Sequence, residues 1–329
     1  MNAIFKPVAA LSIVLVMAGC ATITSDPVPV LACKLKTIGY EYNYPSGSAV
    51  SSGITNSVYT YEGEKIKTTV STISSSFTGT PTSTYTATNT YTYDVDGFVT
   101  ATSSVTTPTS GSTSISSTNS AYTYANGRLM KIVSSDNTTV FNTLSYEYDT
   151  QGKVSKSINA NSTYTETQTF TNGVLTATER VNTNGQVGRV YTIINGRIAK
   201  YTTGAAAFPY FEYTYDTQGN MVESKYLVSA TVVSRIVTYE YNTTGKIIST
   251  PTQKGFPVFP LPSQNSLRTK TTVVNGSGVK LSEIVAAYTV NAKGYVLTQN
   301  ETQTTFNANG TINGTPGTTR QTYSYQDCE

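Results

Sequence analysis

The sequence contains no histidine and no tryptophan, and only 12% of its 329 residues are charged. The absence of histidine excludes Ser-His-Asp triads, histidine-ligated zinc and histidine-ligated haem. The formal net charge is only +3, whereas nucleic-acid binding needs a clustered basic surface. We therefore expect neither a nucleic-acid partner nor histidine-based catalysis.

The residues that are abundant favour β-structure. There are 25 tyrosines and 24 glycines, together with many threonine, asparagine and aspartate residues. Tyrosine and threonine suit strands, whereas glycine, asparagine and aspartate suit turns. An aromatic content of 11% argues against disorder. The length fits two ordinary domains or one large all-β or repeat domain.

Residues 1–19 have the features of a secretory signal peptide. Lys6 supplies a positive start, and Val8–Val16 forms an apolar stretch too short to span about 30 Å of hydrocarbon. Met17-Ala18-Gly19-Cys20 resembles a bacterial lipobox, although leucine is usual at its first position. That resemblance implies that Cys20 is acylated with diacylglycerol and palmitate and that residues 20–32 form a lipidated tether. Because Ala21 follows the cysteine, the resemblance also implies anchoring at the outer membrane. The body would face either the periplasm or the outside. An ordinary signal peptide with an incidental cysteine is the alternative.

Three cysteines are an odd number for an exported protein until Cys20 is assigned to lipid. The remaining two, Cys33 and Cys328, then form one predicted disulfide that joins the two ends of the folded body. Two free thiols are the alternative. Two thiolates without histidine are too few ligands for a zinc site, so we predict no metal.

A short template recurs through the mature chain. It consists of two aromatic residues at i and i+2, then aspartate or asparagine, a glycine and a returning aliphatic residue. Aromatic residues two apart lie on one face of a strand, and the residues that follow favour a tight turn. Each copy is therefore a predicted β-hairpin, which gives roughly twenty strands and little helix. The copies are Tyr91–Val99, Tyr146–Val154, Tyr213–Met221 and Tyr239–Ile247, with looser copies at Tyr59–Gly63, Tyr122–Leu129, Phe170–Leu175, Tyr191–Ile198 and Tyr288–Val296.

The template resembles the YD repeat of RHS-type and related bacterial surface proteins, over about Tyr40 to Tyr325. The resemblance implies one long antiparallel sheet that coils on itself. Large members of the family build shells around toxins, and others act at cell surfaces in contact or ligand binding. This chain has neither a core-end motif nor a toxin domain, so we do not carry the shell function over.

The two ends of the body are predicted strands, Lys34–Tyr44 and Arg320–Asp327, with the cysteine pair at their outer ends. Unpaired sheet edges invite aggregation. We therefore predict that residues 33–329 form an all-β fold, a single antiparallel sheet of hairpins rolled or closed into a barrel. A flatter coiled sheet capped by loops is the alternative.

Candidate chemistry is sparse. The turn residues Asp94, Asp96, Asp149 and Asp216 are interpreted as structural Asx-turns. Asp94-Val-Asp-Gly97 lacks the remaining ligands of a calcium loop, and glycoside hydrolysis would need two carboxylates in one cleft. We predict no catalytic residue, no metal and no cofactor. The protein is thus expected not to be an enzyme; a glycan-active enzyme is a minor alternative.

The segment 250–264 is predicted to be a Pro-rich excursion between hairpins, because proline cannot donate to a sheet ladder. It is either a binding loop or a cover packed over the sheet. The candidate ligand-binding residues are Phe256, Phe259 and Leu261, with Phe208 and Phe211 as a companion group. Ser103–Ser120 is either an extended hairpin or a mobile loop.

Two strand faces stay open to two interpretations. The tyrosine ladder is either sheet core or a platform for sugars and apolar ligands. The threonine row opposite it, from Thr84 to Thr92, is either a solvent face of good strand formers or a contact for ice or polysaccharide.

These features together favour a non-enzymatic envelope lipoprotein that binds or contacts a polysaccharide or protein partner. The alternative is a periplasmic carrier or chaperone that shelters a lipid or apolar peptide in a curved sheet.

Overall fold

The computed structural model describes residues 34–46, 49–79, 82–110, 115–136, 138–203, 210–242, 256 and 267–326. Several predictions from the sequence fall outside these residues. They are the signal peptide at 1–19, the tether at 20–32 with Cys20, both cysteines of the predicted disulfide (Cys33 and Cys328), and Phe208, Phe259 and Leu261.

The described residues form strands and turns, and none of them is helical. No helix in this part of the chain is long and apolar enough to cross a membrane. The strands are β1 Lys34–Ser46, β2 Ala49–Glu62, β3 Lys65–Phe77, β4 Ser83–Tyr93, β5 Val99–Ser110, β6 Ser116–Ala125, β7 Arg128–Asp136, β8 Val140–Tyr148, β9 Val154–Asn161, β10 Tyr164–Thr171, β11 Val174–Asn182, β12 Val187–Ile194, β13 Arg197–Thr203, β14 Tyr210–Tyr215, β15 Met221–Leu227, β16 Val233–Asn242, β17 Leu267–Asn275, β18 Lys280–Val290, β19 Val296–Thr305 and β20 Gly317–Gln326.

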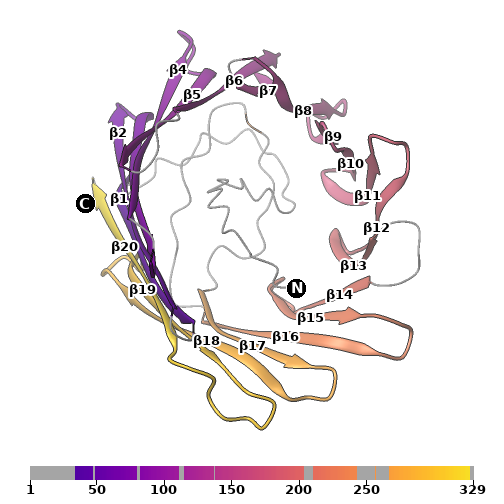
Figure 1. Ribbon diagram of the computed structural model, residues 1–329. Coiled ribbons are helices and arrows are strands. Elements are labelled where there is room, and N and C mark those ends of the chain that lie inside the picture. Colours follow the sequence, from indigo (N-terminus) through magenta and orange to yellow (C-terminus); the bar gives the residue numbers. More distant parts are fainter. Residues whose placement is uncertain are drawn as a thin grey trace.

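The twenty strands form one closed antiparallel barrel. Each strand pairs with the next along the chain, and β20 pairs back onto β1. At this seam Lys34 is the register partner of Gln326, and Asn43 is the partner of Thr318. Figure 1 shows the resulting ring, in which the first and last strands lie side by side. Closure leaves no unpaired sheet edge, so the predicted closed sheet is confirmed and the flatter open sheet is not formed.

The hairpin turns follow from residues that accept a left-handed backbone. Asn126 and Gly127 have φ values of 53° and 73° and connect the paired residues Ala125 and Arg128, as in a two-residue type I′ turn. At the longer turns an Asx side chain organises the loop. Asp149 Oδ1 accepts hydrogen bonds from the backbone N–H groups of Gln151 (2.9 Å) and Lys153 (2.8 Å). The predicted Asx-turns are therefore confirmed at this site.

The described turns from an even-numbered strand to the next odd-numbered strand lie at one end of the barrel, because neighbouring strands are antiparallel. We call this end the glycine-turn rim, since the repeated template supplies its turns at Gly63, Gly97, Gly127, Gly152, Gly173, Gly196, Gly219 and Gly294. The ninth template glycine, Gly245, lies outside the described residues. β1 begins and β20 ends at the same rim.

The Ser/Thr-rich stretch lies at the opposite rim. Its described residues, Ser103–Ser110 and Ser116–Ser120, belong to β5 and β6, so this stretch is a long hairpin where described.

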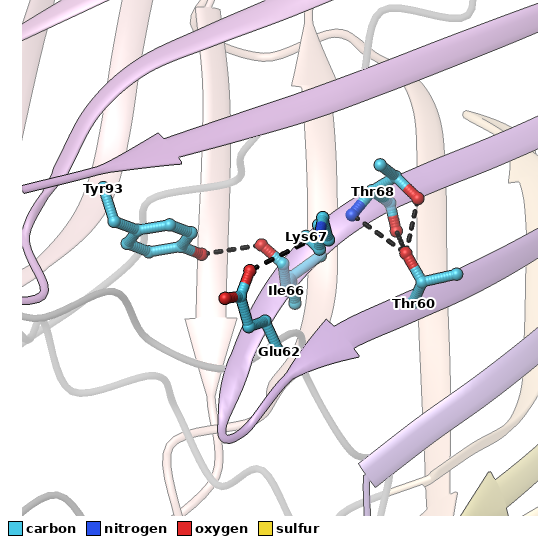
Figure 2. A network of polar contacts seen from close by, with 6 residues as sticks. All are labelled: Thr60, Glu62, Ile66, Lys67, Thr68 and Tyr93. Carbon is cyan, nitrogen blue, oxygen red and sulfur yellow. Dashed lines mark hydrogen bonds and ion pairs between the residues drawn. The ribbon is translucent and has the colours of Figure 1, made fainter.

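In most template copies with two tyrosines, the second tyrosine joins one hairpin to the next. The Tyr93 hydroxyl on β4 donates to the carbonyl oxygen of Ile66 on β3 at 2.8 Å, as Figure 2 shows. In the same view Lys67 pairs with Glu62, and Thr60 accepts from the backbone N–H of Thr68. Equivalent tyrosine-to-carbonyl bonds of 2.6–3.0 Å link Tyr61 to Leu35, Tyr148 to Leu129, Tyr215 to Ile198, Tyr241 to Met221, Tyr288 to Arg268 and Tyr325 to Val296.

The tyrosine face of the wall lines the lumen. Phe256 belongs to the connection between β16 and β17, yet its ring stacks on Tyr122 of β6, with 5.6 Å between the ring centroids. β6 and β16 lie on opposite sides of the ring (Figure 1), so we infer that Phe256 contacts β6 on the inner side of the wall. Phe256 packs there against a buried cluster of Leu129, Tyr146, Val154 and Phe170. Because side chains alternate along a strand, the tyrosines point inward.

The outer face is polar and carries ion pairs. Glu147 and Lys156 are register partners on β8 and β9, with 3.4 Å between their charged atoms. Lys270 on β17 pairs with Glu240 at 3.6 Å and with Glu283 at 3.4 Å. Thr90 and Thr92 of the predicted threonine row are also exposed, and exposed aliphatic residues such as Ile54, Val105 and Val190 are interspersed among polar ones. The barrel therefore has an aromatic lumen and a hydrophilic exterior.

Candidate functional site

Four aromatic rings from four consecutive strands form a continuous row on the lumen face. Tyr191 on β12 is the register partner of Tyr201 on β13; Tyr201 is the partner of Phe211 on β14, and Phe211 of Tyr226 on β15. The ring centroids are 5.7, 4.7 and 4.8 Å apart along the row. We call these four residues the aromatic row. Such cross-strand pairs stabilise a sheet, but all four rings are only half-buried, which leaves part of their surface for a ligand.

Charged side chains lie beside the row on the same face, closer to the rim opposite the glycine turns. Arg180 on β11 and Arg189 on β12 are register partners, and Glu166 on β10 is the partner of Arg180. The Tyr191 hydroxyl donates to Glu166 Oε2 at 3.2 Å. A hydrogen bond with Tyr191 raises the pKa of Arg189 above its ordinary value, and burial raises the pKa of Tyr191. The guanidinium of Arg189 also lies over the Tyr201 ring, 5.3 Å from its centroid.

A recess of about 340 Å³ lies at the end of the row. It is lined by Phe211, Tyr226, Thr203, Ser234 and Arg235. Arg235 on β16 is the register partner of Tyr226, so the row ends on a guanidinium group. Thr203 and Arg235 are exposed. Aromatic faces together with convergent polar groups are the usual content of a binding site.

A larger depression of about 800 Å³ lies over β19, β20, β1, β2 and β3. It is lined mainly by small polar residues, with Glu41 and Arg320 as its charged register pair. Tyr42 is the only aromatic residue in its lining. We regard the smaller recess as the better candidate because it combines two aromatic rings with an arginine.

The turn carboxylates serve the turns in which they occur. Asp94 Oδ1 accepts the backbone N–H of Phe98 at 2.8 Å, and Asp216 Oδ1 accepts that of Asn220 at 2.8 Å. Hydrogen bonds from Thr138 and Thr139 hold the pKa of Asp136 below its usual value. Among the described residues, no group of three or more Cys, Asp or Glu side chains is placed to hold a metal ion.

The candidate ligand-binding residues from the sequence have different positions. Phe211 belongs to the aromatic row, whereas Phe256 packs on Tyr122 and the core cluster. The residues predicted from the sequence did not include Tyr201, Tyr226, Arg189 or Arg235. Tyr201 and Tyr226 lie in none of the template copies, and only the register of β12–β16 brings them together. In the sequence, the only pattern that could have indicated these residues is the alternation of aromatic residues along the predicted strands.

No family model matches the sequence, and no curated protein matches it. The solved structures that match include a porin-like protein from Bacteroides uniformis ATCC 8492, with a TM-score of 0.39 and 14% identity over 89% of this chain and 96% of that chain. Another is the TcdB2-TccC3 structure, with a TM-score of 0.19 and 10% identity over 80% of this chain and 20% of that chain. Both TM-scores are low, so neither likeness carries a conclusion about function. The resemblance to YD repeats stays a prediction from the motifs.

Proposed function

We propose that this protein is a non-catalytic binding barrel that is anchored to the outer membrane by lipid and holds a saccharide chain on its lumen face. The observation that carries the proposal is the aromatic row, Tyr191, Tyr201, Phe211 and Tyr226, which runs across four strands with half-buried rings. A row perpendicular to the strands offers a series of adjacent flat faces rather than one isolated ring.

The chemistry of the row suits a saccharide. A sugar ring has an apolar C–H face and an edge of hydroxyl groups. The aromatic faces cover the first, and donors and acceptors beside them bind the second. The structure provides both: the rings lie next to Arg189, Glu166 and Thr203. A lipid tail would instead need a lining with few polar groups.

The outer face supports a lipid anchor instead of a membrane-spanning barrel. Barrels embedded in a bilayer carry an apolar band outside and a polar interior. Here the ion pairs Glu147–Lys156 and Lys270–Glu283 lie on the outer face and the tyrosines lie inside. Acylation of Cys20, predicted from its lipobox-like surroundings, would attach such a body to the membrane while the barrel remains in water.

The position of the anchor implies an orientation. β1 begins at the glycine-turn rim with Lys34, which donates to the carbonyl oxygen of Gly63 at 3.1 Å and pairs with Glu64 at 2.8 Å. A tether from Cys20 would therefore approach this rim. Arg235 lies near the start of β16 and Thr203 at the end of β13, so both lie toward the opposite rim. In this arrangement the recess opens away from the membrane.

The carrier for a lipid or apolar peptide is the second candidate, and the buried cluster of Leu129, Tyr146, Val154 and Phe170 in the wall favours it. Phe256 already packs against this cluster. A carrier predicts co-purified lipid in extracts of the protein analysed by mass spectrometry, whereas the saccharide proposal predicts none.

The saccharide proposal is tested by calorimetric titration of the full-length protein with a panel of acidic and neutral tetrasaccharides. We expect binding, and we expect Tyr201→Ala to weaken it by about tenfold or more, because an aromatic anchor at the centre of a contact contributes most. Phe141→Ala is the matched control, since Phe141 on β8 is an exposed ring outside the row. The proposal fails if no tetrasaccharide binds, or if the two variants weaken binding equally.

A further inference from the structure

We propose that the ligand of the aromatic row is an acidic saccharide, whose carboxylate is bound by Arg235. This inference rests on the proposed saccharide function and adds to it the chemical class of the sugar. It is carried by the charge and position of Arg235, an exposed arginine at the end of the row.

Arg235 has the position of a ligand-binding cation. It lines the recess with Phe211 and Tyr226, and it is the cross-strand neighbour of Tyr226. Among the described residues it pairs with no carboxylate, whereas cations on the outer face of neighbouring strands do. Lys225 lies 2.8 Å from Glu223, and Lys270 lies 3.4 Å from Glu283. Within the part of the chain that the structure describes, the charge of Arg235 is thus not offset by a carboxylate.

The surroundings of the row are also net positive. Arg180 and Arg189 are register partners beside the row, and Thr203, which lines the recess, is the register partner of Arg189. Glu166 is the carboxylate of this group, and it accepts the hydrogen bond of Tyr191. Together with Arg235, the residues beside the row therefore carry three guanidinium groups and one carboxylate. The guanidinium groups of Arg180 and Arg189 lie over the rings of Tyr164 and Tyr201, which leaves Arg235 as the least engaged of the three.

A uronic acid matches this arrangement. Its ring presents a C–H face to the aromatic side chains, and its planar carboxylate accepts two parallel hydrogen bonds from one guanidinium. A neutral sugar would satisfy the rings but not Arg235. Because Arg235 is exposed, the attraction is screened by salt, so binding is expected to weaken as ionic strength rises.

The test compares each acidic sugar with its own neutral form. The full-length protein is titrated calorimetrically with tetrasaccharides from polygalacturonate, alginate and hyaluronan, and with the same tetrasaccharides after reduction of their carboxyl groups. We expect at least one acidic form to bind about tenfold or more tightly than its reduced form, the scale of a hydrogen bond to a charged group. In Arg235→Ala this preference is lost, and in Arg235→Lys it is reduced, because lysine keeps the charge without the planar fork.

Arg320→Ala is the matched control, since Arg320 is an exposed arginine on the outer face of β20. This variant is expected to keep the full preference for the acidic form. Equal binding of acidic and reduced forms would overturn the inference and leave the saccharide proposal standing. A preference that persists in Arg235→Ala would also overturn it, because the carboxylate would then bind elsewhere. Failure of every tetrasaccharide to bind would overturn both.

Discussion

Replacing Cys33 and Cys328 together by serine is expected to lower the free energy of unfolding of the mature protein by about 2–5 kcal/mol. The reason lies at the seam of the barrel. Lys34, which follows Cys33, and Gln326, two residues before Cys328, are register partners in the β1–β20 pair. A bridge at this place would tie the two ends of the closed sheet together and restrict the unfolded chain over nearly its whole length. The loss is measured by denaturant unfolding of the oxidised protein and of the double variant.

Cys20→Ser is the control for this experiment. This variant removes the one cysteine that is not part of the predicted disulfide. Because we assign Cys20 to lipid, the variant is expected to release the protein from membranes without changing the unfolding midpoint of the barrel. Thiol alkylation followed by mass spectrometry gives an independent reading. Two alkylated cysteines in the native, non-reduced protein would contradict the predicted disulfide, as would identical stability of the oxidised protein and the double variant.

The second large effect is expected at alkaline pH, where the barrel should unfold between about pH 10 and pH 12. Burial raises the pKa values of Tyr61, Tyr148, Tyr288 and Tyr325 from 10.0 to about 12. Each of these hydroxyls donates to a backbone carbonyl of the preceding strand, and an ionised phenol cannot donate. Because the folded state keeps its tyrosines protonated, this stability is fully present below pH 10 and is lost as the pH rises through 12.

Circular dichroism and tyrosinate absorbance, followed together during an alkaline titration, check this expectation. The account predicts that strand signal is lost as the buried tyrosines ionise. Two variants identify the hydrogen bonds as the cause. Tyr148→Phe loses a bond to the Leu129 carbonyl and is expected to be less stable by about 1 kcal/mol at neutral pH. Tyr124→Phe is the matched control, because the buried Tyr124 hydroxyl has no hydrogen-bond partner within the described part of the chain. Ionisation of all tyrosines near pH 10 in a still-folded barrel would contradict the account.

Much of the fold could be predicted because each hairpin is specified locally. The pair Asn126-Gly127 needs no distant contact to adopt its left-handed turn, and the aspartate of Asp149–Gly152 bonds its own backbone. The aromatic and aliphatic residues on either side of each turn become register partners, such as Tyr61 with Ile66 and Tyr148 with Val154. Closure could be predicted because both ends of the body are strands and one closed sheet removes their edges.

The candidate site could not be predicted in the same way, because it depends on register across five strands. The register shifts at Thr192/Ile193 and Thr214/Tyr215 decide which residues on β12–β15 face one another. Shifting one strand by a single residue would move its aromatic side chain to the outer face. The sequence also does not reveal which side of the wall is the lumen. That assignment follows from the contact of Phe256 with Tyr122, which are 134 positions apart in the chain and meet across the ring.

The most direct test of the central claim, that the aromatic row binds saccharide inside the barrel, uses the absence of tryptophan from the sequence. Tyr201→Trp places a single indole in the row, and Thr192→Trp places one at an exposed outward position on β12. Fluorescence is recorded during titration with the tetrasaccharide that binds best in calorimetry. The account predicts a saturable change in emission for Tyr201→Trp and none for Thr192→Trp. An unchanged emission from Tyr201→Trp while calorimetry still reports binding, or an equal change in both variants, would contradict it.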